Sequence, residues 1–258
     1  MITSTSNQKV KELLQLQKKS KSRNQEGLFI AEGSRMVGET PKEALVKLYV
    51  SETYYKKHKE ELHKADIQPE VLTDTVFAYV SDTKTPQGIL GVIRQMNYKL
   101  EDIIERENPH ILVLDNIQDP GNMGTIFRTA ETAGATGILM SGDCVDLYNP
   151  KTIRSTMGAI YRMPFLYQDN LPETIGILKK SGIHVYAAHL EGKNTYDQEN
   201  YLQGTAFLIG NEGNGLRPEV AKCADIWVRI PMSGQAESLN AAMAAGILMF
   251  EVSRQRRQ

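Results

Sequence analysis

The feature that most limits the fold of this chain is a series of short apolar runs in its C-terminal part. Segments of helical pattern separate most of them, and the runs are "ILVL" (111–114), "GILM" (137–140), "HVYAA" (184–188), "AFLI" (206–209) and "IWVRI" (226–230). Short strands without alternation between helices are typical of a parallel sheet covered on both faces. We therefore predict an α/β fold, and this pattern alone favours an open, doubly wound sheet.

Several of these predicted strands end in polar or glycine-bearing turns. The turn at residues 210–216, "GNEGNGL", combines three glycines with Glu212. Such a loop can be a tight turn, a phosphate cradle or the floor of a cofactor pocket. It lacks the GK[ST] ending of a P-loop, and it does not open a Rossmann unit. Ligands of parallel sheets bind outside the carboxyl ends of the strands, so we expect the site at this edge.

The N-terminal part alternates between helix and strand signals and predicts a small α/β domain of its own. Helices are expected at 7–19, 34–39 and 54–65, and strands at 27–33, 46–52 and 86–95. A polar segment then separates the two parts of the chain. The predicted organisation is a domain at 1–96, a linker at 97–108 and a second domain at 109–258.

Composition narrows the class of protein. The chain has 258 residues, a net charge of −1 and 41% hydrophobic residues, as in ordinary globular proteins. No apolar stretch reaches the roughly 18 residues of a membrane span. The N-terminus has no apolar secretion signal, so we expect a cytoplasmic protein. Cys144 and Cys223 lie far apart without a CxxC pattern, which indicates neither a metal site nor a disulfide framework.

Positive charge is concentrated at the N-terminus. The first 23 residues contain Glu12 as their only acid, against Lys9, Lys11, Lys18, Lys19, Lys21 and Arg23. One interpretation is a polyanionic partner. The other is the solvated face of an amphipathic helix whose leucines point inward, and charge alone favours this second interpretation.

A first motif, "DNIQDPGNMGTIFRTAETAG" (115–134), predicts a loop that leads into a helix beginning near Asn122. Helical spacing places Ile126, Ala130 and Ala133 on one face, which should pack on the sheet. Arg128 follows Ile126 by two positions and so points about 200° away from it.

Arg128 and Asn122 each have a structural alternative to a catalytic role. Arg128 can form a surface salt bridge with Glu131 or Glu212, and Asn122 can cap its helix. Taken singly, these alternatives are at least as well supported as a catalytic role.

Another motif, "IPMSGQAESLNAAMAAGILMFE" (230–251), predicts a strand end, a glycine-containing loop and a long helix. Ser238 and Asn240 fall at the helix start, where their side chains can serve as caps. The small residues at 241–246 permit close approach of another backbone. That backbone can belong to a second subunit or to the chain's own sheet, and both interpretations stay open.

Taken together, the motifs carry a family resemblance. "NMGTIFRTAETAG", "GNEGNGL" and "IPMSGQAESLNAAMAAGILMFE" resemble, in order and separation, the three signature motifs of the SpoU/TrmH family of RNA ribose 2′-O-methyltransferases in the SPOUT superfamily. "STMGAIYRMPF" (155–165) is also similar to a family segment. The N-terminal part resembles the family's substrate-binding domain, related to a small ribosomal protein that binds kinked RNA, through "SNQKVKELLQLQKK", "GLFIAEGSRMV" and "TPQGILGVI". The resemblance covers nearly the whole chain.

The resemblance changes the expected fold and assembly. It implies a deep C-terminal trefoil knot whose loops bind the cofactor, although knots are almost absent from proteins and no sequence pattern shows one here. It also implies a homodimer, with the helix at 241–249 as a plausible interface. Arg128 and the cofactor pocket can then come from different subunits.

The implied cofactor is S-adenosylmethionine, and no metal is implied. By resemblance the residues that contact the cofactor are Gly210, Ile230, Met232 and Leu239, largely through main-chain groups. The chemistry is methyl transfer from a sulfonium to a ribose hydroxyl, which is a poor nucleophile until its proton is removed or its charge is stabilised.

The implied catalytic set is Arg128, Asn122, Glu212, Ser238 and Asn240. A guanidinium stays protonated in proteins, so we interpret Arg128 as holding the neighbouring phosphate and stabilising the oxyanion. Glu212 would orient Arg128 or the motif loops. Ser238 and Asn240 would fix the ribose edge.

The implied RNA-contacting residues are Lys9, Lys11, Lys18, Lys19 and Arg35. Structured ribosomal RNA, of the 23S class, is the favoured substrate and transfer RNA the alternative. Housekeeping modification and antibiotic resistance are both compatible with this layout. Two rival interpretations are a non-catalytic RNA-binding protein on the same scaffold and a dehydrogenase-like enzyme. The missing Rossmann fingerprint disfavours the latter.

Overall fold

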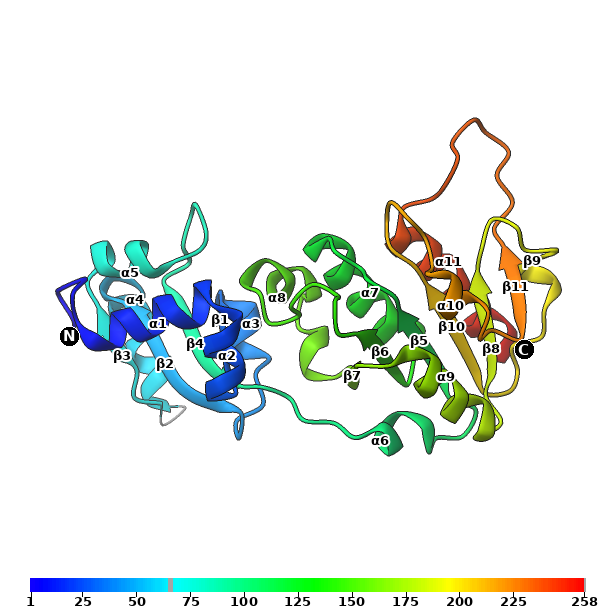
Figure 1. The fold of residues 1–258 in the computed structure, drawn as a ribbon. Coiled ribbons are helices and arrows are strands. Elements are labelled where there is room, and N and C mark those ends of the chain that lie inside the picture. The colour runs from blue at the N-terminus through cyan, green and yellow to red at the C-terminus, as the bar shows by residue number, and fades with distance from the viewer. Residues whose placement is uncertain (65–66, 258) are drawn as a thin grey trace. The chain divides into compact units, whose positions relative to one another are not determined.

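A computed structural model describes residues 1–64 and 67–257 of the chain, which form two compact units (Figure 1). The first unit comprises Met1–Met96 and, after an excursion, Asp146–Tyr161. The second comprises Asn97–Val145 and the chain from Arg162 onward. The chain therefore enters the first unit twice. The last residue of the helix predicted at 54–65 lies outside the described residues.

The first unit is an α/β domain built on a four-stranded sheet in the order β1-β4-β2-β3. Its elements are α1 (Gln8–Lys18), α2 (Ser20–Glu26), β1 (Leu28–Glu32), α3 (Ser34–Gly38), β2 (Leu45–Ser51), α4 (Glu52–Lys64), β3 (Glu70–Leu72), α5 (Asp74–Val80), β4 (Ile89–Arg94), α8 (Pro150–Thr156) and a 3₁₀ helix (Ala159–Tyr161). β4 is antiparallel to both β1 and β2, whereas β2 and β3 are parallel.

Helix α1 shows why the N-terminal segment folds as predicted. Asn7 caps it, because the Asn7 side chain accepts a hydrogen bond from the Lys9 N–H at 2.9 Å. Its apolar face, at helical spacing, packs with α5 against the sheet through Val10, Leu13 and Leu16. The predicted inward face of this helix is confirmed.

Arg23, which the charge count placed in the basic N-terminal segment, is not exposed on the surface. Its side chain is 3% exposed, donates to the carbonyls of Leu16 and Gln17, and forms an ion pair with Asp146 in the returning segment. A buried charge requires such partners. Arg23 therefore belongs to the interior of the first unit rather than to a basic surface.

The second unit contains a seven-stranded sheet in the order β7-β6-β5-β10-β8-β11-β9, in which every pairing is parallel. Its elements are α6 (Leu100–Ile104), β5 (His110–Leu114), α7 (Pro120–Ala133), β6 (Gly137–Ser141), β7 (Phe165–Gln168), α9 (Leu171–Lys180), β8 (His184–Ala188), β9 (Asn194–Thr195), a 3₁₀ helix (Tyr196–Gln198), β10 (Thr205–Ile209), α10 (Pro218–Ala221), β11 (Ile226–Arg229) and α11 (Ala241–Arg256).

Helices cover both faces of this sheet, which confirms the predicted fold class. α6, α9 and α10 bury their apolar residues in one core with alternate residues of the strands. α7 and α11 pack against each other, and α11 also packs on β10. β5, β6 and β10 are buried along their whole length, as strands covered on both faces must be. The implied trefoil knot stays a prediction.

Three elements of the second unit differ from the sequence-based expectation. The segment predicted as a linker contains α6, whose Ile103 is fully buried against Gly137. β7 and β9 were not predicted, because β7 is apolar only at its start and β9 has two residues. None of the described helices is both long enough and apolar enough to span a membrane.

Candidate functional site

The glycine-rich loop after β10 is a closed turn with a narrow neck. The main chains of Asn211 and Gly215 exchange two hydrogen bonds, at 3.0 and 2.9 Å. The Asn211 side chain accepts from the N–H groups of Gly213 and Asn214, as in an Asx turn. A Cβ atom at Gly210 would overlap the main chain between Gly215 and Leu216, so only glycine fits there. The tight-turn interpretation of this loop is confirmed.

This loop also forms one wall of a cavity of about 380 Å³ at the carboxyl edge of the sheet. The other walls come from the segments that follow β8 and β11, and the latter projects as a long loop (orange in Figure 1) before α11. All four predicted cofactor-contacting residues line the cavity, namely Gly210, Ile230, Met232 and Leu239. Glu212 and Ser238, from the predicted catalytic set, line it as well.

The end of β8 contributes a wall that the sequence analysis did not identify. Ala188, His189 and Leu190 line the cavity, and the His189 ring packs on Trp227 with ring centroids 4.1 Å apart. The segment contains no motif of polar residues that would have singled it out. Its position directly after a predicted parallel strand was the available signal.

A chain of side-chain hydrogen bonds joins the three motifs. Asn122 on α7 donates from Nδ2 to Glu212 Oε1 at 3.0 Å, and Asn240 donates from Nδ2 to Asn122 Oδ1 at 2.8 Å. The amide orientations are fixed at both ends. Glu212 is an acceptor only, and the Asn240 oxygen is occupied by the N–H groups at the start of α11. The structure therefore brings Glu212, Asn122 and Asn240 together.

Glu212 also holds the loop that precedes α7. Its carboxylate accepts from the N–H groups of Gln118 and Asp119, at 3.2 and 3.1 Å. Partial burial alone would raise the pKa of Glu212. The hydrogen bonds from Asn122 and from main-chain N–H groups outweigh burial and lower this pKa below 4.5. Glu212 is thus an ionised clamp between two motif loops.

The structural alternatives for Asn122 and Arg128 are both wrong. α7 begins at Pro120 with Asp119 as its cap, and Asn122 lies inside the first turn. Glu131 forms its ion pair with Arg162, and Glu212 is held by Asn122 and main-chain groups. Arg128 is exposed, as its spacing predicts, and its guanidinium has no hydrogen bond or ion pair with any described residue. It does not line the cavity.

Ser238 and Asn240 differ in their structural role. Asn240 caps α11, which confirms the capping alternative, and it also reaches Asn122. Ser238 is exposed, and its hydroxyl has no partner in the described part of the chain. The Ser238 side chain is thus free of described partners, whereas the Asn240 side chain is held at its oxygen and through one of its two Nδ2 hydrogens.

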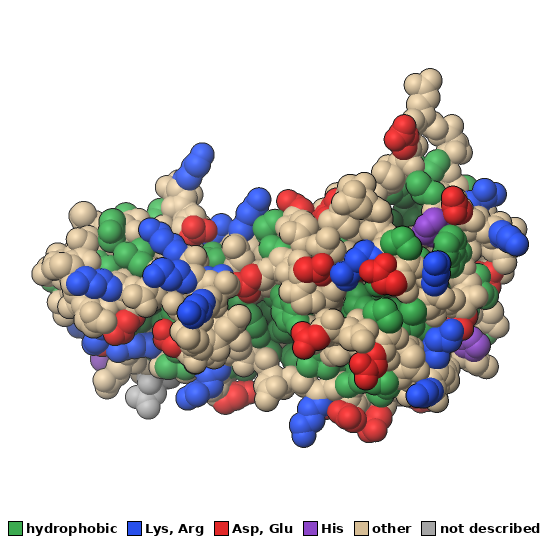
Figure 2. All heavy atoms as spheres, viewed as in Figure 1, with side chains coloured by type: hydrophobic (Ala, Val, Ile, Leu, Met, Phe, Trp, Pro, Cys, Tyr) green, Lys and Arg blue, Asp and Glu red, His purple; other side chains and the backbone are tan. Residues whose placement is uncertain are grey.

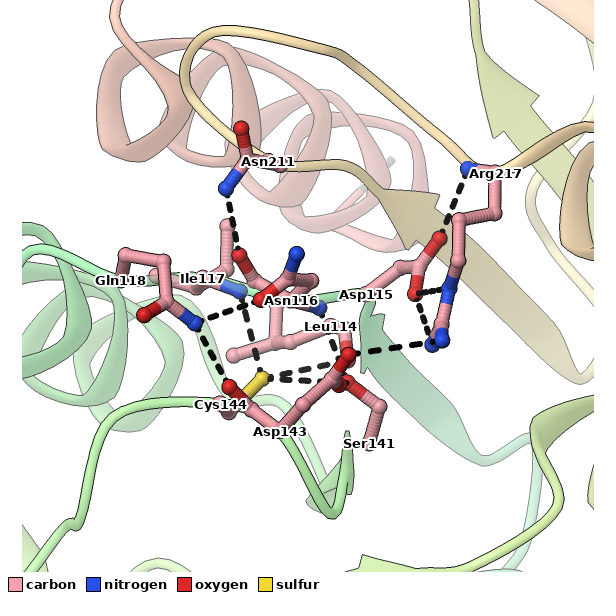
Figure 3. A network of polar contacts seen from close by, with 10 residues as sticks. All are labelled: Leu114, Asp115, Asn116, Ile117, Gln118, Ser141, Asp143, Cys144, Asn211 and Arg217. Carbon is pink, nitrogen blue, oxygen red and sulfur yellow. Dashed lines mark hydrogen bonds and ion pairs between the residues drawn. The ribbon is translucent and has the colours of Figure 1, made fainter.

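An ion pair between Asp115 and Arg217 stabilises the glycine-rich loop after β10 (Figure 3). Asp115, at the end of β5, is fully buried and accepts from the main-chain N–H of Arg217 at 2.8 Å and from its Nε at 2.7 Å. The same guanidinium reaches Asp143 at 3.4 Å. Asn211 adds a hydrogen bond from Nδ2 to the Asn116 carbonyl at 2.7 Å. These contacts fasten the β10 loop to the ends of β5 and β6.

Cys144 belongs to the same network, and its thiol has low reactivity. Its sulfur accepts from the Ile117 N–H at 3.3 Å and lies 3.5 Å from both the Leu114 carbonyl and the Ser141 hydroxyl (Figure 3). Burial raises the pKa of the Cys144 thiol, so the reactive thiolate is disfavoured. The described residues include no group of three or more His, Cys, Asp or Glu side chains suited to a metal ion.

The predicted RNA-contacting residues all lie in the first unit, where Lys and Arg side chains lie over the α1 face (blue in Figure 2). Lys11, Lys18 and Lys19 are exposed, and their ammonium groups have no partner among the described residues. Lys9 instead forms an ion pair with Glu70, and Arg35 pairs with Glu39 at 3.0 Å.

Comparison with known proteins places this geometry in a family. The sequence profile of the SpoU rRNA Methylase family matches residues 109–250, and that of the MRM3-like substrate binding domain matches residues 7–91. The chain is 35% identical over 257 residues to the 23S rRNA (guanosine(2553)-2′-O)-methyltransferase RlmP of Bacillus subtilis, covering 97% of this chain and 98% of that protein.

Solved structures of similar fold support the same family. An AdoMet-bound rRNA methyltransferase from Sinorhizobium meliloti has a TM-score of 0.86 and 33% identity, covering 98% of this chain and 97% of that one. The SpoU methyltransferase AviRb from Streptomyces viridochromogenes, in complex with AdoMet, has a TM-score of 0.87 and 26% identity, covering 97% and 98%. The resemblance inferred from the three motifs is confirmed, and the chain belongs to the SpoU rRNA methylase family.

Proposed function

We propose that the protein transfers the methyl group of S-adenosylmethionine to a ribose 2′-hydroxyl in 23S ribosomal RNA. The observation that carries the proposal is the hydrogen-bonded chain of Glu212, Asn122 and Asn240, which joins the three motifs beside one cavity. The Bacillus subtilis relative, a 23S rRNA 2′-O-methyltransferase by name, supports this RNA and this hydroxyl. Bacterial ribosomal RNA lies in the cytoplasm, so a protein with this substrate is proposed to act in the cytoplasm.

The cavity has the properties that S-adenosylmethionine requires. Its volume of about 380 Å³ lies in the range of small-ligand sites. Ile230, Met232 and Leu239 supply apolar surface for the adenine ring, and Gly210 allows the turn that forms this wall of the cavity to close. The main-chain groups of Met232 and Leu239 make no hydrogen bond within the described residues, which leaves them for the ring's polar edge. When bound, the cofactor supplies an electrophilic methyl group on a sulfonium.

The side chains of the motifs have separate roles in binding the RNA and in stabilising the reacting ribose. The guanidinium of Arg128, which no described residue binds, is suited to hold a phosphate and to stabilise charge that develops on the ribose oxygen. Glu212 is a poor base for a hydroxyl, because hydrogen bonds lower its pKa and occupy its oxygens. We therefore assign Glu212 and Asn122 to fixing the motif loops, and Ser238 to the ribose edge.

Methyl transfer to ribosomal RNA is the direct test of this proposal. With radiolabelled S-adenosylmethionine, we expect label in one ribose of unmodified 23S ribosomal RNA and none in transfer RNA, with the position mapped by primer extension. Label in transfer RNA alone would replace the substrate assignment. Binding of S-adenosylmethionine without label in any RNA, ribosomal particles included, would contradict the activity.

We further propose that the first unit binds the RNA. Lys11, Lys18 and Lys19 are its best candidates for phosphate contacts, because their charges are not compensated by a described neighbour. Lys9 and Arg35 must exchange Glu70 and Glu39 for phosphate before they contribute. The exchange is feasible because surface ion pairs contribute at most about 1 kcal/mol.

A homodimer is the proposed assembly. Met243 and Phe250, seven positions apart on α11, are 59% and 45% exposed, and Ile247 lies between them on the same face. The small residues at 241–246 serve the chain's own packing, because Ala241, Ala242 and Ala245 are buried. The apolar stripe on the other face is what remains for a second copy. Since Arg128 does not line the cavity of its own chain, we propose that it completes the partner's site.

Mixing two inactive variants tests the shared site. Arg128→Ala removes the guanidinium, and Gly210→Ala distorts the turn that forms one wall of the cavity, so each homodimer should be inactive. A mixed dimer would retain one site in which both elements are intact, and we expect partial methyl transfer from it. Affinity tags on the two variants establish that mixed dimers have formed. Mixed dimers without activity would contradict sharing of the site between subunits.

A further inference from the structure

A second cavity, of about 600 Å³, lies within the first unit and has no part in the chemistry described above. It is bounded by the end of β2, the first turns of α4, helix α5 and the loop that precedes β4, which projects from the unit (Figure 1). From this cavity we infer that the first unit captures one unstacked nucleotide of the RNA, with its base against Tyr54 and its phosphate on Lys57. The inference rests on the proposed function, because it concerns recognition of the same RNA.

The stacking surface comes from α4. Tyr54 and His58 are four positions apart, and His58 lies at a kink of α4, where its backbone has φ −115° and ψ 15°. Their rings stack with centroids 4.2 Å apart and an interplanar angle of 23°. The Nδ1 atom of His58 is 2.9 Å from Glu61, which fixes the ring. A flat, ordered pair of rings at the wall of a cavity is suited to a nucleobase, since every base has a π-face.

The polar groups of the cavity are those that a nucleotide uses. Lys57 is exposed and its ammonium has no partner among the described residues, whereas the adjacent Lys56 pairs with Glu52 at 2.6 Å. The Tyr54 hydroxyl is also without a described partner. Gln87 accepts from the Ser34 N–H at 2.9 Å through its oxygen, which leaves its NH₂ group for a ligand. Lys57 thus supplies the cation for a phosphate, and the neutral groups suit a base edge.

The carboxylate in the cavity sets the orientation of the ligand. Asp74 accepts from the Thr53 N–H at 3.1 Å and from its hydroxyl at 2.7 Å, and these bonds keep it ionised by lowering its pKa. A carboxylate repels phosphate and accepts hydrogen bonds from the imino or amino groups of a base. The base therefore lies on the Asp74 side of the cavity and the phosphate on the Lys57 side.

Gly88 allows the main chain of the loop before β4 to form a wall of the cavity close to Ser51 and Tyr54. Its φ of 82° is in the left-handed region, and an added Cβ would lie 2.8 Å from the Ser51 Oγ and 2.9 Å from the Tyr54 Cβ. The main chain of this loop therefore lies directly against the Tyr54 end of the stacking surface. The cavity volume, within the range of small-ligand sites, accommodates a single nucleotide.

Binding of unmodified 23S ribosomal RNA, transcribed in vitro, to variants of the full chain tests the inference. We expect Tyr54→Leu to weaken filter-binding affinity by about tenfold, the typical contribution of one stacked base. Tyr54→Phe, which keeps the ring, should restore most of that loss. Lys57→Gln should weaken binding and reduce the slope of log affinity against log salt by about one unit. Lys56→Gln and Tyr79→Leu, which change exposed residues outside the cavity, should bind like the unaltered protein.

Thermal unfolding and S-adenosylmethionine affinity, unchanged in every variant, would show that folding is intact. Equal RNA affinity and salt slope in the unaltered protein, Tyr54→Leu and Lys57→Gln would overturn the inference, even where methyl transfer proceeds normally. An RNA that is bound but never methylated would overturn the proposed function, and the comparison of variants would still decide on the cavity. An RNA that the unaltered protein does not bind would contradict both.

Discussion

Replacing Arg128 with alanine is expected to lower the rate constant of methyl transfer by about 100-fold or more, the usual effect of removing one donor that stabilises an oxyanion. Arg128 is exposed on α7, and its guanidinium is bound by no described residue, so its charge is free for the RNA. Because it does not line the cavity, the affinity for S-adenosylmethionine should stay unchanged. Single-turnover methyl transfer and calorimetry measure the two quantities separately.

Arg128→Lys refines this prediction. A lysine keeps the positive charge but lacks the planar fork that holds phosphate in two hydrogen bonds. We expect it to restore RNA affinity and to recover only a minor part of the rate. Arg162→Ala on the same unit serves as the matched control, because that arginine already pairs with Glu131. An Arg128→Ala protein with normal turnover would remove this residue from the catalytic assignment.

Replacing Arg217 with alanine is expected to lower the free energy of unfolding by about 3 kcal/mol. That is the lower end of the effect of leaving a buried charge without its partner. Asp115 is fully buried and depends on Arg217 for its compensation, while the Arg217 side chain is 41% exposed, so solvent screens part of the interaction. Urea-induced unfolding, followed by circular dichroism, measures the change.

A double-mutant cycle separates the ion pair from other effects of the substitution. Asp115→Asn combined with Arg217→Ala removes both charges, so the double variant should be more stable than Arg217→Ala alone. Asp143→Asn weakens the exposed contact at 3.4 Å and keeps an amide oxygen that can accept from the Ser141 hydroxyl, so it should cost less than about 1 kcal/mol. A loss for Arg217→Ala as small as that for Asp143→Asn would show that the buried carboxylate does not depend on this arginine.

The parallel sheet and the helix faces were predictable because they depend on local patterns. The unalternating runs matched β5, β6, β8, β10 and β11, and the spacing on α7 correctly separated its buried face from Arg128. The five residues of α6 are too few to show a helical period. The family resemblance, and not a local pattern, supplied the residues that line the cavity.

The contacts that organise the site were beyond sequence reasoning because they join distant segments. Glu212 lies 90 positions from Asn122, and Asn240 lies 118 positions from Asn122, so no spacing rule relates them. Arg217 was not singled out at all, since nothing marks its partner Asp115 as buried and charged. The burial of Arg23, which was counted only as part of the basic N-terminal segment, was not predictable for the same reason, because its counter-ion is 123 positions away.

The partner of Arg23 has a consequence for the order in which the chain matures. During synthesis, residues 1–96 leave the ribosome before the segment Asp146–Tyr161 exists. Until that segment arrives, Arg23 must stay in water or enter the interior without its counter-ion, which is costly. The N-terminal unit therefore completes its folding only after part of the methyltransferase region has been translated. A fragment that stops at residue 96 would be an unfinished protein rather than an independent RNA-binding module.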